Sequence, residues 1–285
     1  MRQRRIAILI DGAFFLKRLP HLVAPQYCKT PQAVANSMRH MCRNHVTRLS
    51  GLAANDHAQQ QGEQWRQFLY RLFFYDAAPY EGKKHHPLLN RTIDFAKSDV
   101  RQFRIALFDA LRKERNVALR LGKVVEDRDW SLPDRQAKRL LATKAWITGI
   151  DFSPAQSGLT LTEAQANEAR RLQRLWDEVE SFHLTPGLRQ KGVDMRIGLD
   201  IASITLKQQA DTIILVAGDS DFVPAAKLAR REGMEFILDP LWQKVNDDLF
   251  EHIDGLRSGL ARPKPGATPG TDFGDAAPDT EGKEQ

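Results

Sequence analysis

The chain of 285 residues and 32.4 kDa is long enough for one large domain or two small ones, and its 42% hydrophobic residues suffice for a buried core. No apolar run approaches the roughly 18–20 residues that a membrane-spanning helix needs, so we expect no membrane association. The net charge of +6 and a pI near 9.4 favour polyanionic partners, which basic proteins attract through counterion release.

The N-terminal segment predicts a buried strand and then a helix. Arg5–Ile10 is a continuous apolar run of the kind that is buried on both faces of a parallel sheet. It is shorter than the ~7–15 apolar residues of a secretory signal and ends at Asp11, so we expect a first strand and no export signal. A helix is expected over about Pro31–Leu49.

The middle of the chain continues the alternation of strands and helices. Aromatic, β-prone residues predict a second strand over Phe68–Tyr75. We expect a loop over Asp76–Leu88, which contains the basic run Lys83–His86. Apolar residues at helical spacing predict an amphipathic helix over Phe103–Leu111, and Val117–Val125 predicts another strand.

The segment from about Glu126 to Leu161 interrupts this alternation. It is rich in charges and contains Trp130 and Trp146, and we interpret it as a partly helical insertion of unassigned role. A further helix is expected from Glu163 to about Val179, with a capping pattern at Thr160–Glu163.

The C-terminal half predicts a strand over Thr212–Ala217, a helix over Phe222–Arg231 that stops at Gly233, and a strand over Glu235–Leu238. Strands that alternate with helices indicate a three-layer α/β sandwich with a central, mainly parallel sheet. We therefore expect one domain over residues 1–258 and, because the rest is rich in Pro, Gly, Asp and Thr, a disordered tail over 259–285.

Two cysteines, Cys28 and Cys42, lie in a stretch expected to be helical. They do not support a disulfide framework, and a cytoplasmic protein is the default expectation. His40 and His45 are nearby, but the spacing fits no zinc finger or ribbon, so we expect no structural zinc.

Three aspartates follow two of the most apolar predicted strands. Asp11 follows the first strand, and Asp219 and Asp221 follow Thr212–Ala217. Open parallel sheets bind ligands beyond the carboxyl ends of their strands, so these carboxylates are expected within reach of one ion. The alternative is that Asp and Gly end these strands only because they favour turns.

Clustered carboxylates repel one another and raise one another's pKa unless a cation compensates them. Mg²⁺ and Mn²⁺ prefer oxygen ligands, can activate water and can neutralise charge on a phosphodiester. An acidic centre in a basic protein therefore distinguishes a nuclease from a plain nucleic-acid binder.

A fourth carboxylate, Asp194, opens an apolar helix after Lys191, and helix N-capping is its alternative role. Asp200 is a weaker candidate, as a metal ligand, as a partner of one, or as part of a salt bridge. Asp76 is expected at a strand end, where it caps or braces the loop.

Three short motifs together resemble the NYN domain family of the PIN-like nuclease superfamily. They are Ile8–Gly12 (Ile-Leu-Ile-Asp-Gly), Lys191–Asp194 (Lys-Gly-Val-Asp) and Gly218–Phe222 (Gly-Asp-Ser-Asp-Phe). The segment Tyr75–Gly82 is similar to one found in bacterial members. The resemblance covers roughly Arg5–Leu256, without the insertion.

The resemblance implies a Mg²⁺- or Mn²⁺-dependent ribonuclease that cleaves RNA phosphodiester bonds. It implies that Asp11, Asp194, Asp219 and Asp221 are catalytic metal ligands, with Asp200 as a further ligand. The family often has Asn three residues after the first Asp, where this chain has Phe14.

Four residues are candidates for contacts with the substrate. The candidates for contacts with RNA are Lys191, Ser220, Lys83 and Lys84, with a solvated surface as the alternative for the lysines. Trp242 and Phe250 are expected in the core or at a docking surface. A homodimer is one assembly that the sequence leaves open.

Other functions stay open to different degrees. An inactive NYN fold that binds RNA or protein is the strongest alternative, and a structural role is a further one. A phosphatase of the haloacid dehalogenase type needs a second Asp where Ala13 stands, and a dinucleotide site needs spaced glycines that Asp11–Phe14 lacks.

Overall fold

The computed structural model describes residues 4–52, 64–127, 129–150 and 161–262. The chain divides into two compact units. Unit 1 comprises Met1–Tyr80, Lys97–Val124 and Gln190–Gln285, and unit 2 comprises Glu81–Ala96 and Val125–Arg189. The predicted insertion, 126–161, belongs to unit 2.

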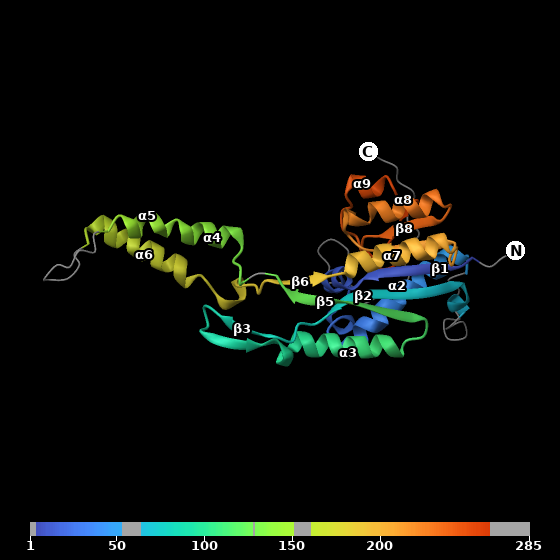
Figure 1. The fold of residues 1–285 in the computed structure, drawn as a ribbon, viewed down its shortest axis with the longest axis horizontal. Coiled ribbons are helices and arrows are strands. Elements are labelled where there is room, and N and C mark those ends of the chain that lie inside the picture. The colour runs from blue at the N-terminus through green and yellow to red at the C-terminus, as the bar shows by residue number, and fades with distance from the viewer. Residues whose placement is uncertain (1–3, 53–63, 128, 151–160, 263–285) are drawn as a thin grey trace. The chain divides into compact units, whose positions relative to one another are not determined.

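A seven-stranded sheet in the order β6-β5-β2-β1-β7-β8-β9 forms the middle layer of unit 1 (Figure 1). Its strands are β1 (Ile6–Asp11), β2 (Leu69–Ala78), β5 (Val117–Glu126), β6 (Leu188–Lys191), β7 (Thr212–Val216), β8 (Glu235–Asp239) and β9 (Gly255–Leu256). The pairs β1–β2, β1–β7, β2–β5, β7–β8 and β8–β9 are parallel, which confirms the predicted α/β class.

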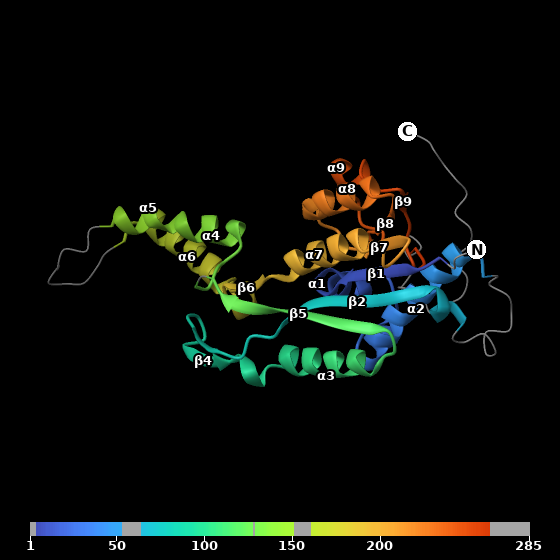
Figure 2. The same cartoon turned by 45° about the vertical axis from the view of Figure 1, so that its right-hand side comes forward.

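Helices cover both faces of this sheet (Figures 1 and 2). One face carries α1 (Gly12–Arg18), α2 (Pro31–Ser50) and α3 (Asp99–Lys113), and the other carries α7 (Val193–Leu206) and α8 (Val223–Arg231). The short helix α9 is Asp247–Phe250.

The first strand shows why its sequence is apolar throughout. Ile6, Ile8 and Ile10 pack in the core on the α2 and α3 face, whereas Ala7 and Leu9 pack in the core on the α7 and α8 face. All five are fully buried. A strand with helices on both sides has no polar face, so the alternation of half-exposed strands is absent.

The register aligns the carboxyl ends of the central strands. Asp11 pairs with Tyr75 of β2, and Ile10 pairs with Val216 of β7, which in turn pairs with Asp239 of β8. Side chains at or just beyond these positions therefore lie at one edge of the sheet.

The described residues of unit 2 form a two-stranded antiparallel sheet and three α-helices. The strands are β3 (Lys83–His86) and β4 (Arg91–Asp94), and the helices are α4 (Asp134–Leu141), α5 (Thr143–Thr148) and α6 (Glu163–Asp177). The predicted Asp76–Leu88 loop is wrong, because β2 continues to Ala78 and Lys83–His86 is a strand.

Several local predictions need correction. A capping box of Thr162 and Gln165 begins α6, and Thr160 lies outside the described residues. Cys28 follows a short 3₁₀ turn and is not helical. The exposed fraction of Phe250 is 55%, so it is not a core residue.

The C-terminal boundary also differs from the prediction. Gly259 and Leu260, which were expected in the disordered tail, are buried. Residues 263–285 of that predicted tail lie outside the described residues. In the described ranges, none of the helices combines the length and the apolar character needed to span a membrane.

Gly12 and Gly198 differ in the space around them. A Cβ on Gly12 would lie 2.5 Å from the Tyr75 carbonyl oxygen and 2.5 Å from Cε1 of Phe74, so α1 approaches β2 too closely for a side chain. A Cβ on Gly198, inside α7, would meet nothing within 4 Å.

We predict that Gly12→Ala lowers the free energy of unfolding by about 2 kcal/mol or more, because backbone must move to admit the methyl group. Gly198→Ala should raise it by about 0.5–1 kcal/mol through helix propensity. Urea unfolding measures both. Equal effects of the two substitutions would contradict the close approach at Gly12.

Candidate functional site

Asp11 ends β1 and caps α1. Its Oδ1 accepts the backbone N–H groups of Ala13 (3.0 Å) and Phe14 (3.1 Å). The pKa of Asp11 is raised from 3.8 to about 6, mainly by burial and also by the charges of Asp194 and Asp76, while the two N–H bonds act to lower it. The fold therefore disfavours the charge on Asp11.

Asp194 lies in the first turn of α7. The N-cap is Gly192, with φ of 77°, so the alternative that Asp194 is the N-cap is wrong. The side chain is exposed. Its pKa is raised by partial desolvation and by the charges of Asp219 and Asp221.

Asp219 and Asp221 lie in the turn between β7 and α8. After Gly218 the chain forms a 3₁₀ turn over Ser220–Phe222, and Asp219 caps it by accepting the Asp221 N–H (3.1 Å). Both aspartates are exposed, and α7 contacts this turn.

We call Asp11, Asp194, Asp219 and Asp221 the acidic set. They interact by repulsion, Asp11 with Asp194 and Asp194 with the other two. Among the described residues, none of the four has an ion pair with Lys, Arg or His. The set therefore holds negative charge that the described protein does not compensate.

Neighbouring carboxylates, in contrast, have partners. Asp76 is fully buried within β2, is ion-paired with Arg104 of α3 and accepts Gln190 Nε2 at 3.3 Å. Asp200 accepts the Tyr75 hydroxyl (2.8 Å) and Arg120 Nε (3.2 Å). Asp76 thus braces β2 against α3, and Asp200 makes a salt bridge to β5.

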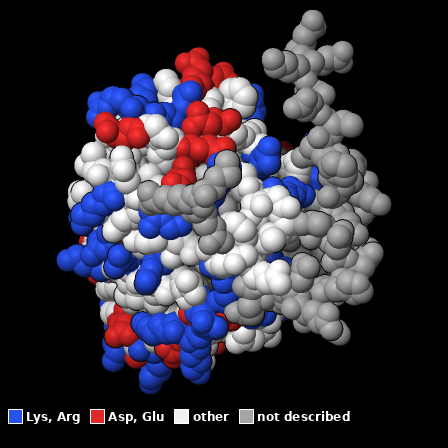
Figure 3. Space-filling view, turned by 90° about the vertical axis from the view of Figure 1, so that its right-hand side faces the viewer, with Lys and Arg blue, Asp and Glu red and all other residues white. Residues whose placement is uncertain are grey.

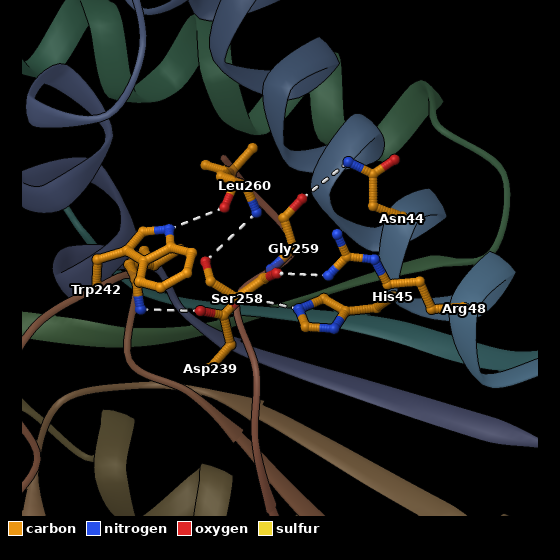
Figure 4. A network of polar contacts seen from close by, with 9 residues as sticks. Asn44, His45, Arg48, Asp239, Trp242, Ser258, Gly259 and Leu260 are labelled. Carbon is orange, nitrogen blue, oxygen red and sulfur yellow. Dashed lines mark hydrogen bonds and ion pairs between the residues drawn. The ribbon is translucent and has the colours of Figure 1, made fainter. Parts of the chain in front are cut away.

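Sequence reasoning missed Asp239, which ends β8. Its fully buried carboxylate lies 2.8 Å from Nε2 of His45 and accepts the N–H groups of Leu241 (2.8 Å) and Gly259 (2.9 Å) (Figure 4). Trp242 belongs to the same network, because its indole donates to the Leu260 carbonyl (2.8 Å). The available signal was the position of this Asp directly after an apolar strand.

In the described part of the chain, the four carboxylates of the acidic set are not grouped as ligands of one ion. In the parts of the chain that the structure describes, no three or more His, Cys, Asp or Glu side chains are arranged to hold a metal together. Capping explains part of the difference, since Asp11 and Asp219 are each turned to backbone N–H groups.

Phe14 occupies space beside the Gly218 turn. A Cβ on Gly218 would lie 2.5 Å from Cε2 of Phe14 and 3.2 Å from Gln243 Nε2. Phe14, at the position where the resemblance predicts Asn, therefore packs an aromatic ring beside the turn that contains Asp219 and presents no polar group there.

The predicted substrate contacts lie on different elements. Lys191 is exposed at the end of β6, not in a loop, and Ser220 begins the 3₁₀ turn. In unit 2, Lys83 is 3.8 Å from Asp94, and the buried Lys84 ammonium is 2.8 Å from Glu126. Lys84 is therefore committed to an ion pair.

Figure 3 shows the face at the right-hand end of Figure 1, where basic and acidic side chains are interspersed. On the visible part of this face the net positive charge is not gathered into one basic surface. The distribution of charge on this face therefore does not indicate a binding surface for a polyanion.

Comparisons with known proteins agree with part of the resemblance. The family model described as the NYN domain, a PIN-like nuclease family, matches residues 152–254. This match includes Asp194, Asp219 and Asp221 but not Asp11. No curated protein matches the sequence.

A solved structure of a protein of unknown function from Vibrio parahaemolyticus also matches, with 14% identity over 90% of this chain and 94% of that one. Its TM-score is 0.34, so this likeness supports no argument about function.

The raised pKa of Asp11 predicts a pH-dependent stability. Between pH 4 and 6 the Asp11 carboxyl is protonated more in the folded protein than in the unfolded chain, so in EDTA its contribution to the free energy of unfolding should fall as pH rises through this range. Asp11→Asn keeps the N-cap and removes the charge. Above pH 6 we expect this variant to be more stable than the wild type by about 1–3 kcal/mol, and the advantage to disappear below pH 4.

Thermal unfolding in EDTA at pH 4 and pH 7.5 measures this difference. Asp109→Asn is the matched control, because Asp109 is an exposed aspartate of α3 that pairs with Arg112. An Asp11→Asn variant that is less stable than the wild type at pH 7.5 would contradict the electrostatic strain at Asp11.

Proposed function

We propose that this chain, whose residues 152–254 match the NYN domain of a PIN-like nuclease family, is a divalent-metal-dependent ribonuclease that hydrolyses RNA phosphodiester bonds at the acidic set. One observation carries the proposal. The four carboxylates repel one another and have no basic partner among the described residues, while Asp76, Asp200 and Asp239 each have a cation or an imidazole beside them.

The donor set fits Mg²⁺ or Mn²⁺ by its chemistry. Carboxylate oxygens are the preferred ligands of these ions, and Mg²⁺ commonly uses one or two protein carboxylates together with waters and substrate phosphate oxygens. Convergence of three side chains before the ion and the RNA bind is therefore not required. When bound, such an ion lowers the pKa of a coordinated water and compensates charge on the phosphate.

In this proposal the residues of the acidic set have different roles in metal binding and proton transfer. Asp11 and Asp219 are fixed by N–H bonds to one carboxylate oxygen each, which leaves their other oxygens to hold the ion. Asp194 is exposed and has no such bond in the described chain, so it can accept a proton from the attacking water.

Lys191 and Ser220 are the proposed substrate contacts nearest to the acidic set in sequence. Lys191 is exposed three residues before Asp194, and Ser220 lies between Asp219 and Asp221. An ammonium and a hydroxyl at these positions can bind non-bridging oxygens of the scissile phosphate. Asp200 as a further ligand, cytoplasmic location and a homodimer remain predictions.

The alternative is a catalytically inactive NYN fold that binds RNA or protein. Two observations favour it: Phe14 puts an apolar ring beside Gly218, and the carboxylates do not converge. The two functions differ in whether binding of RNA is followed by hydrolysis.

We predict that the protein cleaves single-stranded or structured RNA with Mg²⁺ or Mn²⁺ and not in EDTA. Asp219→Asn should lower the cleavage rate at least about 100-fold, because it removes charge that holds the ion and leaves the cap in place. Gel analysis of end-labelled RNA measures the rate, with Asp109→Asn as the control of unchanged activity.

Full activity of Asp219→Asn would assign the cleavage to another site or another protein. RNA binding without hydrolysis under either ion, for the wild type as well as the variant, would favour the inactive module.

A further inference from the structure

The side chain of Gln243 lies against the Gly218 turn, directly before Asp219. A Cβ on Gly218 would be 3.2 Å from Gln243 Nε2, so the carboxamide is next to the backbone that leads into Asp219. Gln243 is exposed, and its carboxamide has no hydrogen-bond partner among the described residues. Its two amide hydrogens are therefore available to a ligand at this turn.

The sheet topology explains why a residue that follows β8 reaches this turn. The strands β7 and β8 are parallel neighbours, and Val216 pairs with Asp239 at their carboxyl ends. Gly218 and Gln243 follow these two residues at the edge that also bears Asp11, because β1 is the other neighbour of β7. The loop after β8 is therefore a further segment at the candidate site, beside the loops after β1 and β7.

The loop that carries Gln243 has an unusual backbone conformation. Leu241 and Trp242 have φ of 48° and 61°. Residues other than glycine rarely adopt this left-handed region, and bulky ones persist there only where the surrounding structure holds them. Two consecutive residues of this kind directly precede Gln243, so the conformation of the loop is maintained against backbone strain.

Hydrogen bonds from distant parts of the chain hold this conformation. Asp239, which is itself bonded to His45 of α2, accepts the Leu241 N–H at 2.8 Å. The Trp242 indole donates to the Leu260 carbonyl at 2.8 Å (Figure 4). The buried His45–Asp239 pair lies outside the acidic set, and its contacts fix the two residues that precede the exposed carboxamide.

The first helix adds a third contact to the same loop. Nη2 of Arg18, at the end of α1, donates to the Leu241 carbonyl at 2.8 Å. The loop after β8 is thus connected to the helix that Asp11 caps. These contacts define the place of the carboxamide relative to the acidic set.

A neutral donor suits a position beside carboxylates that bind a cation. A lysine or arginine next to Asp219 would pair with it and compete with a metal ion, whereas another carboxylate would repel the phosphates of an RNA strand. A carboxamide donates hydrogen bonds to a phosphate oxygen and leaves the charge of the acidic set unchanged.

From these observations we propose that Gln243 is a substrate-binding residue, whose Nε2 donates a hydrogen bond to a phosphate oxygen of the RNA strand at the acidic set. The strained loop positions this donor at Gly218, where the ring of Phe14 offers none. The inference rests on the proposed function for the identity of the substrate, but the contact that it assigns does not require hydrolysis.

Fluorescence anisotropy of a labelled, short single-stranded RNA tests this contact on full-length Asp219→Asn protein in EDTA. Gln243→Leu should weaken binding about 5- to 10-fold, the loss of one solvent-exposed hydrogen bond. Gln243→Glu should weaken it further, because a carboxylate repels phosphate.

Gln209→Leu is the matched control, because Gln209 precedes β7 at the opposite edge of the sheet, and it should leave the affinity for RNA unchanged. Gln243 is exposed and its carboxamide is unpaired in the described chain, so its replacement should not impair folding, which thermal unfolding checks.

Three results would overturn the inference. They are no binding of RNA by the Asp219→Asn protein, equal effects of Gln243→Leu and Gln209→Leu on RNA affinity, and a Gln243→Leu protein that loses affinity for Mn²⁺ in calorimetry but keeps its affinity for RNA. Absence of cleavage by the wild type, together with the expected loss of affinity in Gln243→Leu, would refute the proposed hydrolysis alone.

Discussion

The parallel register of the central strands brings several carboxylates to one edge of the sheet. Whether each carboxylate has a basic partner distinguishes the members of this group. Asp76 and Asp239 are buried and are held by Arg104 and His45. The four aspartates of the acidic set have no such basic partner in the described chain. Repulsion that the fold itself does not relieve is the physical basis for expecting a cation there.

Three glycines near this edge lie in close contact with neighbouring backbone or side chains. Gly12 lets α1 begin against β2 directly after Asp11, and Gly122 of β5 lies where a Cβ would be 2.5 Å from the Lys191 carbonyl oxygen. Gly218 accommodates the ring of Phe14. These contacts restrict the backbone that positions the aspartates. Substitutions at these glycines would therefore affect the site indirectly, by moving that backbone.

The acidic set lies in one of the two units. Unit 1 holds its four aspartates and the segments that resemble NYN motifs, and the family match crosses from unit 2 into unit 1. Among the described residues, unit 2 holds the β3–β4 sheet and the helices α4, α5 and α6.

The sequence by itself determined the long apolar strands, the amphipathic helices and the position of Asp11 and Asp219 after strands, because burial on two faces and turn chemistry leave local patterns. It did not determine β6, β9 or the β3–β4 hairpin, because these strands are short and all but β9 carry charged residues. Only the tertiary structure decided which carboxylates are compensated. Arg104 is 28 residues from Asp76 and His45 is 194 residues from Asp239, and such pairs depend on packing that no local pattern encodes.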